Sequence, residues 1–123
     1  MKLDRTRRGD GPLVSGMTAG GFRVDDGIYP ALLMTPQRAD LWEPPAFEAL
    51  DADALAAVLG IDPAPEFLLL GTGATLRQPP RALVRGLDAR GLGIEAMDSR
   101  AAARAWGVLR DEGRRIVAAF YPF

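Results

Sequence analysis

Apolar runs in the second half of the chain predict a sheet with buried strands. Residues 67–70 and 116–121 are apolar at every position, which is typical of strands that are covered on both faces. We therefore expect both strands to lie inside the sheet, with the side chains of Leu69 and Val117 buried. Residues 94–97 predict a further strand that lies between these two in the sequence.

Helical patterns separate these strands. Pro79 and Pro80 open a helix that Gly91 ends, and its inner face is predicted to consist of Leu83, Val84 and Leu87. A longer helix runs from a cap at Asp98 or Ser99 to about Glu112. On a wheel of 100° per residue, its apolar stripe consists of Ala102, Ala105, Trp106 and Leu109, and its opposite side of Arg100, Arg104, Arg110, Asp111 and Arg114.

The first half of the chain predicts a hairpin and a shorter helix. Residues 22–24 and 28–34 form the two arms around Asp25-Asp26-Gly27, because Asp-Gly supplies the positive φ angles of a tight turn. Short strands are expected at residues 13–14 and 41–42. A helix over 51–59 is predicted from three features: Asp51 as its N-cap, a contact between Leu50 and Leu55, and Gly60 in the left-handed position at its end.

Strands that alternate with helices build a layered α/β domain, and their crossover connections favour parallel pairing. The hairpin adds antiparallel strands, so we expect a mixed sheet flanked by helices. A length of 123 residues predicts a single domain over 1–123. Within it, residues 1–12 are expected to form a loose N-terminal segment.

Composition excludes several kinds of chemistry. The sequence contains no cysteine and no histidine. Thiolate nucleophiles, disulfides, the commonest general base and the commonest metal ligand are therefore missing. We predict no catalytic residue, no metal and no cofactor.

Charge and hydropathy limit the partners. A formal net charge of −1 provides no broad basic surface for nucleic acid. No segment approaches the roughly 20 apolar residues of a membrane span, and the charged start of the chain does not resemble a signal peptide. We predict a cytoplasmic protein that neither binds nucleic acid nor inserts into a membrane.

Two strand-to-helix turns are candidate binding elements. Gly71-Thr72-Gly73 follows a central strand, at the end of the sheet where ligands often bind; the alternative is a tight turn that needs glycine. Asp98-Ser99-Arg100 begins the long helix, whose free N–H groups attract anions; the alternative is simple capping. If strands 67–70 and 94–97 are parallel, we expect Thr72 and Ser99 within about 12 Å of each other, at one concavity for an anion or polar small molecule.

The long helix supplies a third candidate. Its charged face offers a partner protein Arg104, Gly107, Asp111 and Arg114, and a simply solvated face is the alternative. Gly107 costs the helix roughly 0.5–1 kcal/mol relative to alanine, which suggests a close packing contact there. Glu112 lies at the C-terminal end of the helix, where the dipole disfavours an anion. We predict that Glu112 forms a structural ion pair with an arginine.

In order and spacing, four segments resemble the family known as domain of unknown function 498. They are FLLLGTG at 67–73, EAMDS at 95–99, AAARAWGVL at 101–109 and EGRRIVAA at 112–119. The resemblance extends over residues 13–122 and implies the Mth938-like fold, a three-layer α/β arrangement around a mixed five-stranded sheet. The family includes the mitochondrial complex I assembly factor of animals and the adipogenesis-associated domain protein. This sequence has Ser99, Ala103, Trp106 and Gly107 where the family usually has Thr, Cys, Tyr and Asn, which counts against catalysis by the long helix.

The sequence leaves three functions open. The resemblance and the missing catalytic side chains favour a non-enzymatic interaction or assembly domain, of the kind that helps a respiratory complex mature, with a protein partner. The second function is binding of an anion or small molecule at the turns 71–73 and 98–100. The third is an enzyme that uses Ser99 or Thr72 with a carboxylate.

Overall fold

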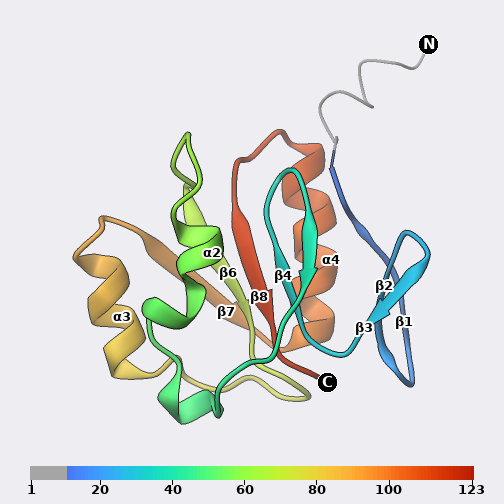
Figure 1. The fold of residues 1–123 in the computed structure, drawn as a ribbon, viewed down its shortest axis with the longest axis horizontal. Helices are drawn as coiled ribbons and strands as arrows, with labels where there is room; N and C mark the ends of the chain where they lie inside the picture. Colours follow the sequence, from blue (N-terminus) through green and yellow to red (C-terminus); the bar gives the residue numbers. More distant parts are fainter. Residues whose placement is uncertain (1–10) are drawn as a thin grey trace.

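Two sheets organise residues 11–123, the part of the chain that the computed structural model describes (Figure 1). The five-stranded sheet has the order β5-β4-β8-β6-β7, with β4 at Leu32–Met34, β5 at Ala39–Leu41, β6 at Phe67–Gly71, β7 at Gly93–Met97 and β8 at Val117–Phe120. Its strand β6 is parallel to β7 and β8, whereas β4 is antiparallel to β5 and β8. The predicted mixed sheet is confirmed. A three-stranded antiparallel sheet contains β1 (Val14–Thr18), β2 (Gly21–Val24) and β3 (Gly27–Tyr29).

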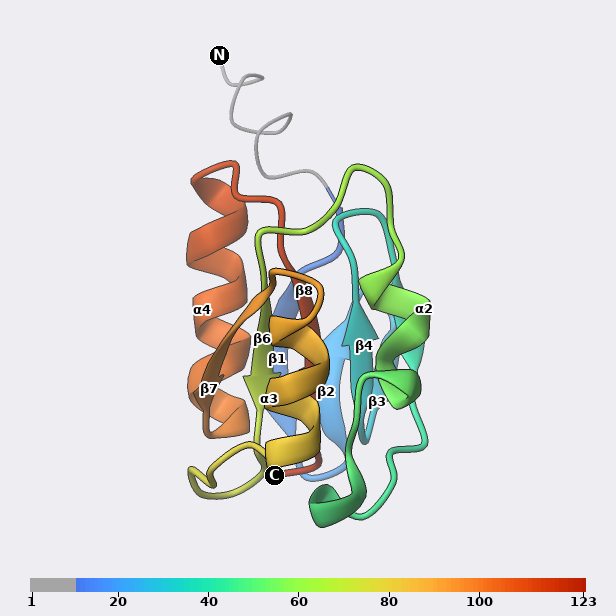
Figure 2. The same cartoon turned by 90° about the vertical axis from the view of Figure 1, so that its left-hand side faces the viewer.

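Helices and the small sheet cover the large sheet on both faces (Figures 1 and 2). One face carries the short 3-10 helices η1 (Phe47–Ala49) and η2 (Asp53–Leu55), together with α2 (Ala56–Leu59) and α3 (Arg81–Asp88). The other face carries α4 (Ser99–Asp111) and the small sheet. This layered α/β arrangement is the one that the sequence predicted.

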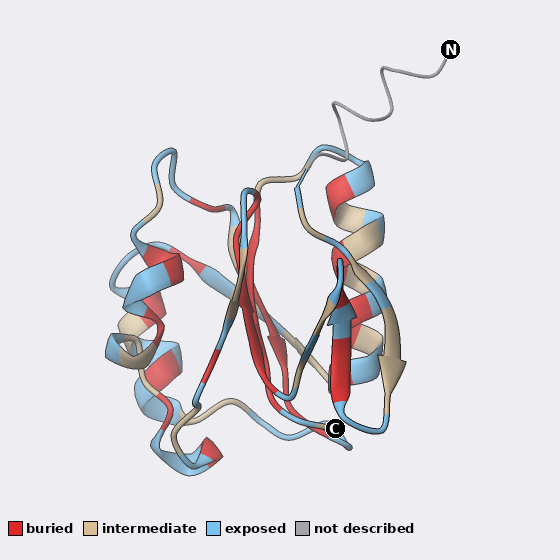
Figure 3. Cartoon of the chain, turned by 45° about the vertical axis from the view of Figure 1, so that its right-hand side comes forward, coloured by how far each residue is buried: buried red, intermediate tan, exposed pale blue. Residues whose placement is uncertain are grey.

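Each face of the large sheet has its own apolar core, because side chains alternate along a strand. Leu68 and Leu70 of β6 pack against α2 and α3, whereas Leu69 packs against α4 and β2. The side chains of Leu69 and Val117 are completely buried, as predicted. Figure 3 shows β8 buried along its length and β6 buried after its first residue, Phe67, which is half-buried.

The hairpin differs from the prediction in two ways. Residues 28–34 do not form one strand: β3 pairs with β2, and β4 joins the large sheet. Pro30 lies between them and cannot donate a hydrogen bond to a ladder. The turn itself consists of Asp25 and Asp26, since Val24 pairs with Gly27, and the positive φ of 51° is at Asp25.

The helices before β7 are less regular than predicted. Asp51 does cap the segment, since its Oδ1 accepts from the Ala54 N–H at 3.0 Å. However, η2 and the single turn of α2 replace one continuous helix, and Gly60 has an ordinary φ of −91°. Val84, which was assigned to the inner face of α3, is 37% exposed.

The buried face of α4 is turned relative to the predicted stripe. It consists of Ser99, Ala102, Ala103, Trp106 and Arg110. Arg110, predicted on the outer side, is buried and donates through Nη1 to the Arg114 carbonyl at 2.6 Å. Ala105 and Leu109, which were predicted in the stripe, are only half-buried. Both residues lie at the border of the buried face of α4 and line a groove there.

The N-terminal strand is tied to α4. Trp106 donates through Nε1 to the Pro12 carbonyl at 2.9 Å, and Val14 and Met17 pack against the same core as Trp106. The loose segment predicted over 1–12 lies, for residues 1–10, outside the described residues.

Gly107→Ala is expected to stabilise the protein by roughly 0.5–1 kcal/mol, because alanine favours the helix. An added Cβ at Gly107 would meet no atom within 4 Å outside its own helix, so the predicted close contact is absent from residues 11–123. The control is Gly71→Ala, whose Cβ would lie 2.8 Å from Phe120 Cδ1 and from Ser99 Oγ and should destabilise strongly. Denaturant unfolding measures both, and an unchanged or lower stability of Gly107→Ala contradicts the expectation.

Candidate functional site

The two predicted binding turns meet at one end of the sheet. Since β6 and β7 are parallel, their carboxyl ends lie at the same end of the sheet. Thr72 N–H donates to the Met97 carbonyl at 2.9 Å. Gly73 N–H donates to Ser99 Oγ at 2.8 Å, and Ser99 N–H donates to the Gly73 carbonyl at 2.8 Å. The predicted proximity of Thr72 and Ser99 is confirmed.

The hydroxyl groups at this junction are fully used inside the protein. Ser99 Oγ donates to the Tyr121 carbonyl at 2.7 Å, and Thr72 Oγ1 donates to the Thr75 carbonyl at 2.7 Å. Thr72 Oγ1 also accepts from the Arg77 N–H at 3.1 Å. Both Thr72 and Ser99 are 0% exposed. Neither hydroxyl reaches a ligand in this arrangement, so an enzyme built on Ser99 or Thr72 has no support from the geometry.

The first turn of α4 is capped from within the chain. Asp98 Oδ1 accepts from the Ala101 N–H at 3.0 Å, and the Asp98 carbonyl accepts from the Ala102 N–H at 2.9 Å. The guanidinium of Arg100 lies 4.4 Å from the ring centroid of Phe123. An incoming anion would also meet the Asp98 carboxylate, which repels it. Anion binding at 98–100 stays a prediction that these contacts do not favour.

Arg77, which the sequence did not single out, holds the turn after β6 in place. Its Nε and Nη2 donate to the Thr72 carbonyl at 3.1 and 3.0 Å, and its guanidinium lies 4.0 Å from the ring centroid of Phe47. Tyr121 beside it donates through its hydroxyl to the Pro45 carbonyl at 3.0 Å. Burial raises the pKa of Tyr121 to about 12, so the phenol stays protonated at neutral pH. This cluster is structural.

An apolar groove lies between β7 and α4. Its volume is about 520 Å³. Phe67, Leu69 and Met97 contribute from the sheet, and the wall on α4 consists of Ala105, Val108 and Leu109. The sheet covers the wall on α4 only in part: Ala105 and Leu109 are half-buried, whereas Val108 is 60% exposed.

The strand beside this groove has an open edge. Within residues 11–123, β7 pairs only with β6. The Met97 carbonyl points toward β6, where it accepts from Thr72 N–H, so by alternation the backbone groups of Ile94 and Ala96 point outward. A second groove of about 360 Å³ lies on the other face of β7 and includes Val84, Leu92, Ile94 and Ala96. Figure 2 looks onto this edge, with α4 on one side of β7 and α3 on the other.

The charged side chains around the groove between β7 and α4 have a net negative charge. Arg114 lines it, but Arg114 Nε lies 2.6 Å from Oε1 of Glu66, which neutralises the guanidinium. The Arg115 N–H donates to Glu66 Oε2 at 2.9 Å, and this hydrogen bond, followed by that from Arg114, lowers the pKa of Glu66. Glu95 in the same groove is exposed.

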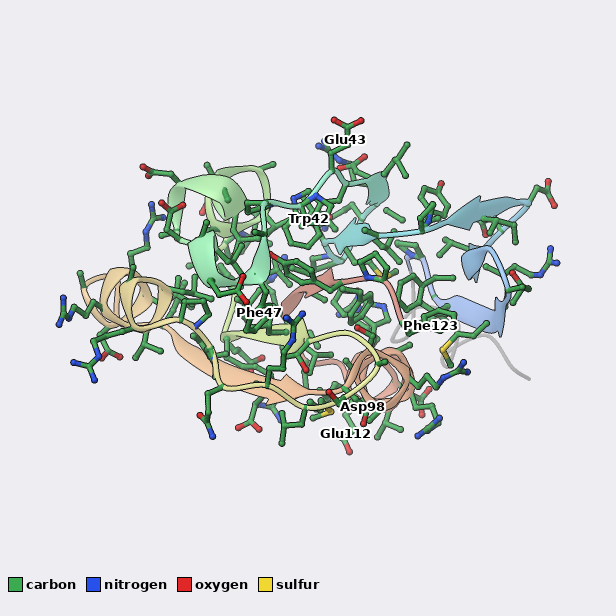
Figure 4. The ribbon with its side chains drawn as sticks, turned by 90° about the horizontal axis from the view of Figure 1, so that it is seen from below. Trp42, Glu43, Phe47, Asp98, Glu112 and Phe123 are labelled. Atoms are coloured by element: carbon green, nitrogen blue, oxygen red, sulfur yellow. The ribbon has the colours of Figure 1, made fainter. Side chains whose placement is uncertain are left out.

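The predicted ion pair of Glu112 is not found among residues 11–123. Glu112 is exposed, and within the described residues no arginine lies at ion-pair distance from its carboxylate, since Arg114 turns to Glu66 instead. In Figure 4 the Glu112 side chain points out of the molecule. Its spacing of four and seven residues from Val108 and Ala105 places it on the groove side of α4. The exposed carboxylate adds to the negative charge there.

The predicted interaction face of α4 is divided in the structure. Arg104 and Asp111 are exposed and Gly107 is half-buried on the outer side of the helix, whereas Arg114 turns toward the groove. The sequence analysis missed Glu95, Met97 and Val108. Val108 and Leu109 follow Ala105 by three and four residues, and this spacing was a visible signal of an apolar wall. The sequence did not show that β7 is an edge strand.

Other sites find no support in the part of the chain that the structure describes. No group of three acidic side chains that could hold a metal ion occurs there. In the same residues, no helix has the length and apolar character needed to cross a membrane. The cytoplasmic location predicted above stays a prediction.

The comparison with known families matches nearly the whole fold. A profile of the family described as protein of unknown function (DUF498/DUF598) matches residues 14–121. The chain belongs to this family. An uncharacterized protein from Rhodobacter capsulatus is 33% identical over 110 residues, which cover 89% of this chain and 83% of the relative.

Solved structures agree with the DUF498 assignment. A Bordetella pertussis protein described as an Mth938-like domain is 30% identical, with a TM-score of 0.77 and coverage of 99% of this chain and 92% of that chain. A Bartonella henselae protein described as an outer membrane protein is 25% identical, with a TM-score of 0.80 and coverage of 91% and 95%. The predicted family and the Mth938-like fold are therefore confirmed, and the function of the DUF498 family itself is unknown.

Ser99→Ala is expected to lower the free energy of unfolding by about 1–3 kcal/mol, because it leaves the buried Gly73 N–H and Tyr121 carbonyl without partners. Ser15→Ala is the matched control, since Ser15 is exposed and its hydrogen bond at 3.4 Å is long. Equal unfolding midpoints for the two variants would show that the buried bridge contributes nothing.

Glu66→Gln is expected to reduce stability by less than about 1 kcal/mol at neutral pH, because the ion pair is partly exposed. The folded-state pKa of Glu66 is lowered from 4.5, so its contribution is present above that value and is lost as the pH falls through the lowered pKa. Unfolding curves of both proteins between neutral and acidic pH should therefore converge in acid. A difference that grows in acid contradicts this assignment.

Proposed function

We propose that this DUF498 protein is a non-enzymatic protein-interaction domain that binds its partner along β7 and the groove beside α4. The observation that carries the proposal is the open edge of β7 next to uncovered apolar side chains of α4. Single exposed apolar residues are common on proteins. A contiguous apolar groove beside an edge strand whose outer side is unpaired is the kind of surface that protein partners bury.

The chemistry of the remaining surface supports interaction over turnover. The hydroxyls of Thr72 and Ser99 are buried and hydrogen-bonded within the protein, and burial raises the pKa of the Tyr121 phenol. The alternative, an anion or small-molecule binder at 71–73 and 98–100, would find the N–H groups of Gly73 and Ala101 already occupied. The proposal that the partner is part of a complex under assembly rests on the resemblance to a family that includes an assembly factor.

Val108→Lys is expected to abolish partner binding while the fold is retained, because it places a charge in the exposed apolar wall. The matched control is Leu41→Lys, since Leu41 is 63% exposed and lies on β5 at the opposite edge of the same sheet. Tagged wild type and both variants serve as bait in native lysate of the source cells, and retained proteins are identified by mass spectrometry. The interaction is then repeated with the purified partner.

A partner kept by wild type and Leu41→Lys but lost by Val108→Lys supports the proposal. If Val108→Lys retains the same partners as wild type, or if no bait retains a partner that binds again when purified, the β7–α4 surface is not the functional site. A thermal shift with phosphate, sulfate or nucleotides, lost in Arg100→Ala, would favour the alternative function.

A further inference from the structure

We propose that the partner supplies an extended, basic segment that pairs with β7 as an added strand, with lysine or arginine side chains toward Glu95. This inference rests on the proposed function and specifies the binding mode and the chemistry of the partner. It is carried by three features of one surface: the open backbone of β7, the grooves on both of its faces, and the acidic side chains that line them.

The backbone of β7 is prepared for strand addition. The N–H and carbonyl groups of Ile94 and Ala96 point away from β6 and, among the described residues, have no strand to pair with. A peptide that forms hydrogen bonds with these groups extends the large sheet by one strand, a recurring mode of peptide recognition. Because β7 is straddled by α3 and α4, the added strand would lie between two walls (Figure 2).

The grooves receive the side chains of such a strand. Side chains of a strand alternate between the faces of a sheet. Those on one face would reach the groove with Leu92, Ile94 and Ala96, and those on the other the groove with Met97 and Leu109. A helix laid on the same edge would leave the outward N–H and carbonyl groups of β7 unpaired. The two-sided arrangement therefore favours an extended segment.

Charge specifies the partner further. The charged residues that line the two grooves are Asp88, Glu95 and Arg114, and Arg114 is paired with Glu66. Glu112 adds an exposed carboxylate on the groove side of α4. A lysine or arginine side chain matches this surface, since its aliphatic stem packs on apolar residues while its charged end reaches a carboxylate. The negative balance disfavours an acidic segment.

The same charge argues against a second copy of this chain as the occupant. Glu95 is the central residue of Gly93–Met97. An antiparallel pair of β7 strands with full overlap would place Glu95 directly opposite Glu95 of the second copy, and like charges in that position destabilise a sheet. A charge on an edge strand also discourages indiscriminate pairing. Glu95 therefore disfavours pairing of β7 with a second copy and favours pairing with a basic strand.

The test uses short synthetic peptides and the full chain. The first peptide alternates valine with lysine, the second alternates valine with glutamate, and the third repeats the first with proline at its centre. Affinity is measured by titration, and hydrogen exchange is measured for the amides of Ile94 and Ala96. We expect the valine–lysine peptide to bind and to slow exchange at both amides. The other two peptides should bind roughly tenfold or more weakly, because one has the wrong charge and the other lacks a central N–H donor.

A charge reversal makes the test specific. Glu95→Lys should transfer the preference from the valine–lysine to the valine–glutamate peptide, while Glu48→Lys, a change of an exposed carboxylate on the 3-10 helix η1, should leave the preference unaltered. A preference that does not change in Glu95→Lys overturns the assignment of Glu95 as the charge that selects the partner.

Failure of this inference and failure of the proposed function are distinguishable. If the proline peptide binds as well as the first, or if the amides of Ile94 and Ala96 exchange unchanged, strand addition is wrong. If no peptide binds although Val108→Lys abolishes capture of the natural partner, the interaction function stands and the basic strand is wrong. If the peptides bind as expected but Val108→Lys does not affect the natural partner, the proposed function is wrong.

Discussion

The buried hydroxyl of Ser99 joins three elements whose relative positions determine the rest of the structure. Ser99 is the first residue of α4. Its hydroxyl accepts from the Gly73 N–H, just after β6, and donates to the Tyr121 carbonyl, just after β8. Gly71 permits this contact, since a Cβ there would lie 2.8 Å from Ser99 Oγ. These hydrogen bonds fix the start of α4 against β6 and β8, and the helix then packs one face on the sheet. Ala102, Ala103 and Trp106 fill the core, and Val108 remains outside.

The proposed binding surface follows from this fixed position. Among the described residues the large sheet ends at β7. Ala105 and Leu109 pack only partly against the sheet and stay half-buried, and Val108 is 60% exposed. The turns that attracted attention in the sequence thus have a structural role: they position the helix. The apolar residues that this position leaves uncovered are the ones that a partner can bury, and the acidic groups around them limit which partner does so.

Much of the fold was predictable because local patterns and burial agree. Solid apolar runs correctly predicted β6 and β8. A cap at Asp98 or Ser99 was predicted to begin α4, and the structure has it at Asp98. The prediction failed where position in the sheet decides the outcome. Residues 28–34 look like one strand, but Pro30 lets the chain leave one sheet and enter another. Glu112 was predicted to pair with an arginine close in sequence, but Arg114 pairs with Glu66, which is distant in the sequence.

The candidate site was less predictable than the fold for the same reason. No local pattern distinguishes an edge strand such as β7 from an inner one, since the order of strands depends on pairings between distant segments. Ile94 and Ala96 alternate with Glu95 and Met97, but only the strand order shows that, among residues 11–123, β7 has a single neighbour. The wall of the groove on α4 was visible on the helical wheel, but its exposure was not.

The most direct test of the binding surface is site-specific crosslinking in the native cell. A photoreactive amino acid replaces Val108 in the groove, Leu41 on the opposite edge of the sheet, or Leu76, which is 61% exposed in the loop after β6. Our account predicts that a partner protein is crosslinked from position 108 and not from the other two positions. Crosslinks from position 41 or 76 to a partner that position 108 never reaches would contradict it.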